Sequence, residues 1–353
     1  MKKIFVINPG STSTKVAVFE DGKAVWMSGG HHPTSEIAMF HSPLEQYEYR
    51  KEFILDKLAK SGIPLEFDAV IGRGGLTKPV EGGVYNINEQ MIRDLREAKD
   101  QHACNLGPII AFDIARQCHC PAFMADPGVV DELQPLARIT GLPFMKKRTI
   151  WHALNSRAVS RRYAKSIGKR YEDMNLIVVH LGGGISIGAH QKGRVVDVNN
   201  ALNGDGPFSP ERTGTLPMNQ IIDLCFSGKY SQKQITKMIT GHGGIVAHLG
   251  TNDMITVSRE AEAGNEPYHT VLNAMLYSVA KHVGAMYVAL DGQVDAIIYT
   301  GGIAHSKYCI DTLKRRTSYM APVVVMPGEG EMESLAYNAL GALNGELEIK
   351  EYV

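Results

Sequence analysis

The chain of 353 residues has few cysteines, no excess charge of either sign and no long apolar run. Its 37 lysines and arginines balance its 37 aspartates and glutamates, so electrostatics give no reason to expect a nucleic acid or an anionic membrane as partner. No apolar run approaches the ~20 residues of a membrane span. The first one stops after Ile7, short of the roughly 7 to 15 apolar residues in an export signal. The sequence therefore predicts neither a membrane span nor an export signal.

The cysteines are odd in number and irregularly spaced: Cys104, Cys118, Cys120, Cys225 and Cys309. Reduced thiols in a cytoplasmic protein are the simplest interpretation. Cys118 and Cys120 have a metal-like spacing, but no second pair of ligands follows nearby. Buried thiols are the favoured interpretation of this pair, and a metal site is the alternative.

What is present is typical of a soluble globular protein, with 44% hydrophobic and 21% charged residues. A chain of this length buries roughly three quarters of its unfolded surface and usually forms two domains. This composition excludes a disordered chain, a collagen-like repeat and a small disulfide scaffold.

An internal repeat is the most informative feature. Residues 4–25 (IFVINPGSTSTKVAVFEDGKAV) and 176–196 (LIVVHLGGGISIGAHQKGRVV) each contain an apolar strand, a glycine-containing turn, an alternating strand and a second turn. The first turn glycine recurs at an offset of 172 and the second at 171, so one residue is gained or lost inside the motif. Similarity between two unrelated hairpins is the alternative. The repeat favours a duplicated pair of α/β domains.

Helical and strand patterns alternate along the rest of the chain, which indicates an α/β fold with mixed sheets. The pattern predicts helices over residues 44–61, 88–100, 152–168, 217–227, 231–240, 266–290 and 331–345. It predicts further strands over 67–72, 121–127, 295–300 and 321–327.

Two of the glycine turns have the composition of phosphate-binding loops. The first, from Asn8 to Lys15, combines hydroxyls, backbone donors and a lysine, although the Gly-x4-Gly-Lys spacing of a Walker A loop is absent. The second, His180 to Ser186, contains three successive glycines, which let backbone approach a ligand. A polar hairpin tip is the alternative for each, and two such tips together favour phosphate. A third turn, Thr300 to Ala304, suits a flat nucleoside or a plain strand-to-helix connection.

These segments resemble the acetate kinase/butyrate kinase (acetokinase) family, within the actin-like ATPase superfamily. The resemblance covers essentially the whole chain and is carried by NPGSTSTK at 8–15, HLGGGIS at 180–186 and YTGGIA at 299–304. Further matches are Gly72-Arg73-Gly74-Gly75, the strand tip at Asp126, Ser209-Pro210-Glu211-Arg212-Thr213-Gly214 and Gly330-Glu331-Met332-Glu333.

Three departures from acetate kinase point to the butyrate kinase branch. The chain has Asn105-Leu106-Gly107-Pro108 in place of His-Asn-Pro-Pro, and His152-Ala153-Leu154-Asn155-Ser156 in place of His-Gly-Thr-Ser-His. It has His-Leu-Gly-Gly-Gly from His180 in place of His-Leu-Gly-Asn-Gly. A role that acetate kinase assigns to its first histidine has no counterpart at Leu106.

The resemblance implies two duplicated actin-like (ribonuclease H-like) domains with mixed sheets flanking a central nucleotide cleft. The expected N-terminal domain covers residues 1–155 plus 333–353. The expected C-terminal domain covers 156–332, binds nucleotide and carries the surface of a homodimer or higher homo-oligomer.

The implied reaction is reversible transfer of the ATP γ-phosphoryl group to the carboxylate of butyrate or a short or branched relative, with ATP/ADP as substrate and Mg²⁺ as cofactor. An ionised carboxylate is already a nucleophile, so positioning and cations replace base catalysis. An actin-like ATPase switch or a sugar or hydroxyl kinase of the same fold is the alternative. Butyrate, isobutyrate, valerate and propionate are candidate acids, and residues near Val84-Tyr85, Gly107-Pro108 and Pro207-Phe208 are candidates for the acyl pocket.

The family's motifs assign roles residue by residue. The implied catalytic residues are Arg73, Arg212, His152 and His180. Phosphate and nucleotide contacts are implied for Asn8, Ser11, Ser13, Lys15, Gly182, Gly183, Gly184, Asp253, Gly301, Gly302 and Ile303. The implied Mg²⁺ carboxylates are Asp126 and Glu331, acting through water. For Arg73 and Arg212, the alternative is a surface salt bridge.

Overall fold

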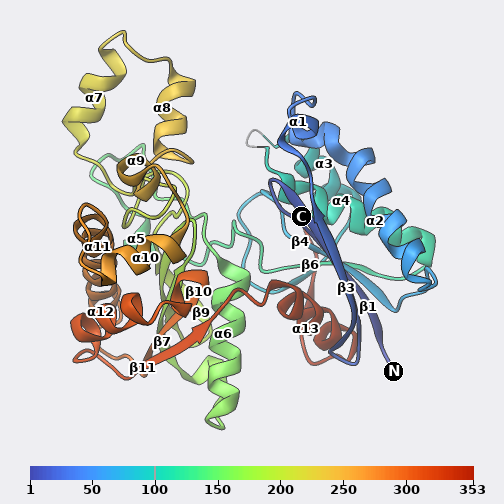
Figure 1. Cartoon of the computed structure of the whole chain (residues 1–353). Coiled ribbons are helices and arrows are strands. Elements are labelled where there is room, and N and C mark those ends of the chain that lie inside the picture. The colour runs from blue at the N-terminus through green and yellow to red at the C-terminus, as the bar shows by residue number, and fades with distance from the viewer. Residues whose placement is uncertain (99–100) are drawn as a thin grey trace. The chain divides into compact units, whose positions relative to one another are not determined.

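The computed structural model describes residues 1–98 and 101–353, which form two compact units (Figure 1). The first unit contains Met1–Val130 and Gly330–Val353, and the second contains Asp131–Glu329. The sequence predicted divisions after residues 155 and 332 instead. Residues 131–155 belong to the second unit because they lead into helix α6 (Ala153–Ser166), which packs on two strands of that unit.

The first unit has a seven-stranded mixed sheet with the strand order β12-β5-β6-β4-β1-β2-β3. Its strands are β1 (Lys3–Pro9), β2 (Ser13–Glu20), β3 (Lys23–His31), β4 (Ala69–Arg73), β5 (Val84–Asn86), β6 (Ala122–Ala125) and β12 (Ile349–Lys350). Its helices are α1 (Thr34–Ile37), α2 (Tyr47–Ser61), α3 (Glu89–Glu97), α4 (Leu106–Cys118) and α13 (Glu331–Leu343).

Helices cover both faces of this sheet, so its central strands are apolar on both sides. Phe5 and Ile7 of β1 share a core with Ile54 of α2 and Ile110 of α4. Helix α13 packs against β1 and β4, apart from that core. Because alternate residues of β1 point to two covered faces, the strand needs no polar side, which accounts for the continuous apolar run at the start of the chain.

The second unit has a five-stranded mixed sheet with the order β11-β10-β7-β8-β9. Its strands are β7 (Asn175–Leu181), β8 (Ile185–Gln191), β9 (Arg194–Val198), β10 (Ala296–Gly301) and β11 (Val323–Pro327). Besides α6, its helices are α5 (Pro135–Arg138), α7 (Met218–Phe226), α8 (Gln232–Ile239), α9 (Ile245–Leu249), α10 (Met254–Glu262), α11 (Tyr268–Ala289) and α12 (Lys307–Thr317).

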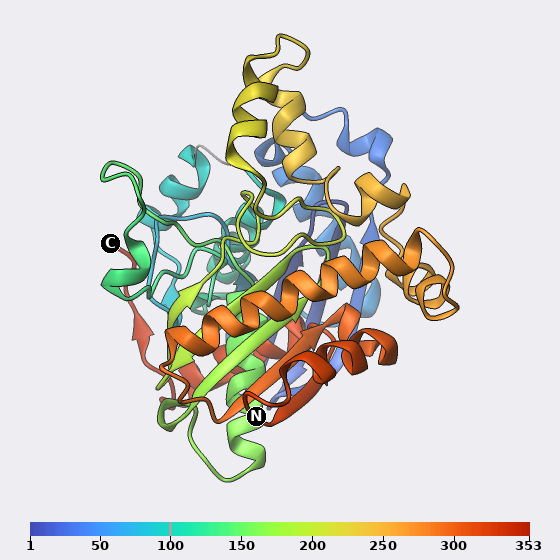
Figure 2. The ribbon, with the colours of Figure 1, turned by 90° about the vertical axis from the view of Figure 1, so that its left-hand side faces the viewer.

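Two separate cores lie on the two faces of this sheet. Helix α11 crosses one face, where Leu276 and Val283 pack with Val179 of β7 (Figure 2). Helix α6 covers the other face, where Val159 packs with Val178. The alternation of neighbouring β7 residues between the two cores is the period-2 pattern of a strand.

The two sheets repeat one topology, as the sequence predicted. An antiparallel meander (β1-β2-β3, and β7-β8-β9) continues through its first strand into two parallel strands (β4-β6, and β10-β11). The register also confirms the one-residue difference between the repeats. Pro9 pairs with Thr14 across four residues, whereas Leu181 pairs with Ile185 across three.

Local irregularities recur at matching places. A β-bulge separates Val18 from Phe19 in the first unit, and another separates Ala189 from His190 in the second. Neither unit, over residues 1–98 and 101–353, contains a helix that combines the length and apolar character needed to cross a bilayer.

Candidate active site

The turn between β1 and β2, called here the first tip (residues 10–13), is exposed and tightly closed. The Gly10 amide donates to the Ser13 carbonyl at 2.8 Å. Ser11 Oγ lies 3.2 Å from Nε2 of His102, whose Nδ1 lies 3.0 Å from Cys104 Sγ. Burial raises the pKa of Cys104 to about 11, so this thiol stays protonated at neutral pH. Lys15 is exposed on β2, two residues beyond the tip.

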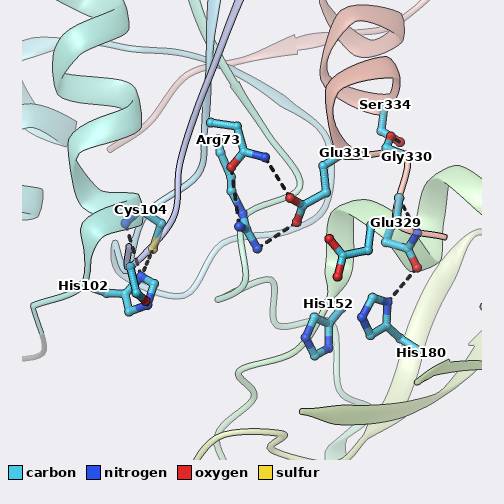
Figure 3. A network of polar contacts seen from close by, with 12 residues as sticks. Arg73, His102, Cys104, His152, His180, Glu329, Gly330, Glu331 and Ser334 are labelled. Carbon is cyan, nitrogen blue, oxygen red and sulfur yellow. Dashed lines mark hydrogen bonds and ion pairs between the residues drawn. The ribbon is translucent and has the colours of Figure 1, made fainter. Parts of the chain in front are cut away.

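Arg73, Asn8 and Glu331 form a polar network within the first unit (Figure 3). The Arg73 guanidinium forms an ion pair with Glu331, Nη2 to Oε1, at 2.8 Å, and its Nη1 lies 3.5 Å from Asn8 Oδ1. The Asn8 amide donates to Glu331 Oε2 at 2.8 Å. Both oxygens of Glu331 therefore have partners in the protein.

The topology explains why these three residues meet. Asn8 is the next-to-last residue of β1, Arg73 ends the neighbouring parallel strand β4, and Glu331 is the first residue of α13, which packs on both strands. Glycine is required beside them, because a β-carbon at Gly72 would lie 2.4 Å from the Gly107 carbonyl oxygen.

Asp126 follows β6 and is almost fully buried, with a left-handed backbone (φ 40°). Its Oδ1 accepts a hydrogen bond from the Gly83 amide at 2.9 Å. Among residues 1–98 and 101–353, no group of three or more histidine, cysteine, aspartate or glutamate side chains is arranged to hold a metal ion. The Cys118-His119-Cys120 segment is therefore not arranged to hold a metal ion. Burial also raises the pKa of the Cys120 thiol to about 12.

In the second unit, His152 and His180 stack face to face, with ring centroids 3.8 Å apart and planes 9° apart. His180 Nδ1 lies 2.8 Å from Asn155 Oδ1, and His152 Nδ1 lies 2.9 Å from Ser186 Oγ. The sequence predicted both histidines as site residues, and the structure brings their rings together.

Arg212 packs directly against the glycine turn between β7 and β8, called here the second tip (residues 182–184). Its Nη1 donates to the Ala201 carbonyl, and a β-carbon at Gly184 would lie only 1.8 Å from that nitrogen. Burial lowers the pKa of Arg212, while Glu211 opposes the shift, and an arginine remains charged at neutral pH. The predicted arginine and the predicted glycines thus form one structural cluster.

The second tip is held by backbone and hydroxyl donors. The Gly183 carbonyl accepts from Ser209 Oγ at 2.7 Å and from the Glu211 amide at 3.2 Å. Asn252 in turn donates to Glu211 Oε1 at 2.8 Å.

The third glycine turn borders a cavity of about 300 Å³ that lies within the second unit. Gly302, Ile303, Met254 and Ile255 are among its lining residues. Gly302 has open space around the position of a β-carbon, whereas a β-carbon at Gly301 would lie 2.4 Å from the Leu181 carbonyl oxygen.

Asp253 precedes the lining residue Met254 in the chain and has a local structural role. It is the N-cap of α10, and its carboxylate accepts hydrogen bonds from the Ile255 and Thr256 amides and from Thr256 Oγ1. These hydrogen bonds lower the pKa of Asp253.

Sequence reasoning missed two polar residues that hold this site in place. Asn155 links His180 to the carbonyls of Gly328 and Glu329. Arg50, fully buried in α2, donates to the carbonyls of the first tip. Arg50 shares an i, i+4, i+8 stripe with the buried Ile54 and Leu58, and a charged residue on such an apolar stripe was the available signal.

Comparisons with known proteins identify relatives of this chain. The family model of the acetokinase family matches residues 145–317. The chain is 67% identical over 350 residues to a probable butyrate kinase from Phocaeicola vulgatus, and 54% identical over 351 residues to one from Bacteroides thetaiotaomicron. Each alignment covers 99% of this chain and 99% of the relative.

Among solved structures, the acetate kinase of Porphyromonas gingivalis superposes with a TM-score of 0.80 at 19% identity, covering 97% of this chain and 100% of that one. At this identity the likeness concerns the fold, and it confirms the predicted actin-like architecture. The two relatives matched over almost their whole length settle the family: this chain is a member of the acetokinase family.

Proposed function

We propose that this protein is a short-chain fatty acid kinase, which reversibly transfers the γ-phosphoryl group of ATP to the carboxylate of butyrate or a close relative, giving the acyl phosphate and ADP. The names of the relatives at 67% and 54% identity support this proposal. The observation that carries it is that an arginine lies at each of the two tips: Arg212 packs against Gly184, and Arg73 contacts Asn8 beside the first tip.

The chemistry of this reaction favours arginines over a general base. The acid is ionised at neutral pH and is already nucleophilic, so the barrier comes from bringing two anions together and from charge on the transferring phosphoryl group. Preorganised positioning supplies up to about 7–11 kcal/mol in such reactions. A hydrolytic switch has no carboxylate substrate to neutralise, which makes it the less supported alternative.

In the first unit we assign Arg73 to the carboxylate of the acid. Its fork is oriented by Glu331 and Asn8, and a planar guanidinium can bind a carboxylate through two parallel hydrogen bonds. Asn8, Ser11, Ser13 and Lys15 are assigned to phosphate oxygens, supported by their position at or beside the exposed first tip.

In the second unit we assign Arg212, His152 and His180 to the transferring phosphoryl group, and the amides of Gly182, Gly183 and Gly184 to the phosphate chain. The nucleoside is assigned to the third glycine turn at Gly301, Gly302 and Ile303, supported by the volume of the cavity that Gly302 and Ile303 line together with Met254 and Ile255. Asp253 is assigned a contact at the rim of this cavity. We propose that Arg73 and Arg212 act together on the acid and the transferring phosphoryl group.

The donor chemistry of Asp126 and Glu331 suits Mg²⁺, which is usually held by one or two carboxylates together with water and substrate phosphates. When bound, the ion supplies positive charge to the phosphate oxygens. We propose that these two carboxylates hold it through water, since Glu331 already binds Arg73 and Asn8 directly.

We further propose a cytoplasmic homo-oligomer. The five cysteines are all free thiols in the structure, consistent with a reducing compartment. Helix α7 projects from the second unit (Figure 1) and has no buried residue. Its Met218, Ile222 and Phe226, four positions apart and so on one face, are exposed. Light scattering of the purified protein measures the assembly: a monomeric mass would contradict this proposal.

The reaction is tested by incubating the purified protein with Mg²⁺, ATP, hydroxylamine and a panel of short-chain acids. Hydroxylamine traps an acyl phosphate as hydroxamate, so colour that depends on the acid is the expected result. ATP consumption that is equal without acid and yields no hydroxamate would contradict the proposal and favour an ATPase switch. Phosphorylation of a sugar in the absence of acid would favour the hydroxyl kinase.

A further inference from the structure

Arg50 is a fully buried arginine whose contacts converge on the first tip. Its Nη1 donates to the carbonyls of Gly10 and Ser13, both at 2.9 Å, and its Nη2 donates to the Ser11 carbonyl at 2.9 Å. Nη1 also lies 3.0 Å from Thr14 Oγ1. A single side chain of α2 thus donates hydrogen bonds to three carbonyl groups of the first tip.

These contacts determine which backbone groups the first tip presents. The fourth carbonyl, that of Thr12, accepts from the His32 amide at 2.8 Å. All four carbonyls of residues 10–13 are therefore bound, whereas the amides of Ser11 and Thr12 have no acceptor among the described residues. Because Ser11 and Thr12 are exposed, the first tip offers donors outward and keeps its acceptors inward. That polarity suits an anion.

The charge of Arg50 is not cancelled by a carboxylate. Within residues 1–98 and 101–353 its partners are backbone carbonyls, Thr14 and Gln46, whose Oε1 accepts from Nε at 2.9 Å. By contrast, the buried guanidinium of Arg157 does have a carboxylate partner, since it forms an ion pair with Glu132. A buried charge without a counter-ion is costly, and burial lowers the pKa of Arg50.

A chain of hydrogen bonds fixes the far side of this arrangement. Thr14 Oγ1 accepts from Arg50 and lies 2.8 Å from His32 Nε2, and His32 Nδ1 lies 3.1 Å from the Tyr49 hydroxyl. Tyr49 donates to Glu36 at 2.6 Å. Burial lowers the pKa of His32. A neutral His32 with its proton on Nδ1 satisfies every group in the chain.

We propose that Arg50 is a positioning residue for phosphoryl transfer: it draws the carbonyls of the first tip inward, so that the tip amides face a phosphate group, and its uncancelled charge attracts that phosphate. The inference rests on the proposed function, because it assigns the phosphate-bearing substrate to this tip. Arg50 acts through the tip and makes no contact with the substrate itself.

Two substitutions of Gln46 distinguish the effect of the Arg50 charge from the effect of the hydrogen bond that Gln46 accepts. Gln46→Glu keeps an acceptor for Arg50 Nε but places a negative charge beside the guanidinium, which holds the new carboxylate ionised. Gln46→Met removes the acceptor without adding charge. We expect Gln46→Glu to raise the KM and the calorimetric Kd for Mg²⁺–ATP roughly tenfold, as cancelling one unit charge near an anion does, with an unchanged or higher Tm.

Gln46→Met is expected to change the ATP affinity by less than about twofold, since the charge of Arg50 remains. Two results would overturn the inference: Gln46→Glu with wild-type ATP affinity and kcat/KM, or equal losses in both variants. Either result would make Arg50 a purely structural residue.

Arg50→Lys gives an independent readout. It keeps the charge but loses the planar fork, whose two terminal nitrogens bind the three carbonyls and Thr14 Oγ1 together, so kcat/KM for ATP should fall while KM for butyrate stays within about twofold. Arg157→Lys is the matched control for altering a buried arginine, and it should affect Tm more than ATP affinity. If the wild-type protein forms no acyl phosphate, the proposed function fails, whereas the calorimetric comparison of the Gln46 variants still tests the role of Arg50.

Discussion

Gly184→Ala should inactivate the enzyme by displacing Arg212 without unfolding the second unit. The added β-carbon would lie 1.8 Å from Arg212 Nη1, where real contacts are essentially never under 3.0 Å. The guanidinium must therefore move by more than about 1 Å, and a misplacement of this size can cost on the order of 10²-fold in rate. The main obstacle is the far end of a long side chain, and the Ala201 carbonyl oxygen, at 3.2 Å from the added β-carbon, needs only a small shift, so the backbone can keep its fold.

The assay is hydroxamate formation with saturating butyrate and ATP, together with a thermal melt. We expect kcat to fall roughly 100-fold, with a Tm within a few degrees of wild type. Gly141→Ala is the matched control, because a β-carbon there meets no atom within 4 Å in the same unit. That variant should keep the wild-type kcat and Tm.

A double-mutant cycle with Arg212→Lys tests the stated cause. If Gly184→Ala acts through Arg212, the double variant should be no slower than Arg212→Lys alone, since residues in contact show non-additive effects. Wild-type activity in Gly184→Ala, or losses that multiply in the double variant, would refute the reasoning.

Three further predictions concern other parts of the site and the core. Arg73→Lys keeps a positive charge but loses the fork that contacts Glu331 and Asn8, so KM for butyrate should rise at least roughly tenfold while KM for ATP changes little; initial rates at varied acid measure this. Gly302→Ala adds a methyl group into open space, so Tm should not change, whereas a several-fold higher KM for ATP would report a nucleoside in the adjoining cavity; an unchanged KM would place the nucleoside elsewhere. Burial lowers the pKa of His190 to about 3, against about 6.5 in an unfolded chain. The unfolded state therefore binds the extra proton, and stability should fall as the pH drops from about 6.5 toward 3. Urea midpoints at several pH values measure this slope, which should be shallower in His190→Gln.

The repeated hairpins could be predicted because their signals are local. Glycine turns and period-2 alternation lie within about twenty residues of one another, and the shift in offset from 172 to 171 corresponds to the shorter turn before Ile185. Helices with one apolar stripe and a clear cap were also predicted, as for residues 88–100, where Asn88 caps α3 (Glu89–Glu97). The last two residues of that prediction, 99–100, lie outside the described residues.

Helix α4 was missed because its sequence lacks that contrast. Gly107 and Pro108 lie in its first turn, and residues 106–111 are all buried, so no polar face marks the period of 3.6 residues. Proline is tolerated there because the first turn has no internal acceptor for its missing N–H.

The site was predicted as a set of residues but not as a set of contacts. Glu331 was expected to organise Mg²⁺, whereas the structure shows it bound to Arg73 and Asn8, 258 and 323 positions away along the chain. Such pairs depend on how α13 packs on β1 and β4, and no local pattern encodes that packing.

The two tips occupy matching places in the repeated topology but are held in different ways. In the second tip, neutral donors from Ser209 and Glu211 hold the Gly183 carbonyl, and the charged group, Arg212, lies against the turn itself. In the first tip, the charged group is Arg50, which lies behind the turn and binds its carbonyls. The Gly183 carbonyl at the second tip and all four carbonyls of the first tip are therefore bound. The position of the arginine decides whether its charge acts by direct contact or through the turn. At the second tip, displacing the Arg212 guanidinium should therefore cause a large loss of kcat. At the first tip, cancelling the charge of Arg50 should cause a loss of ATP affinity.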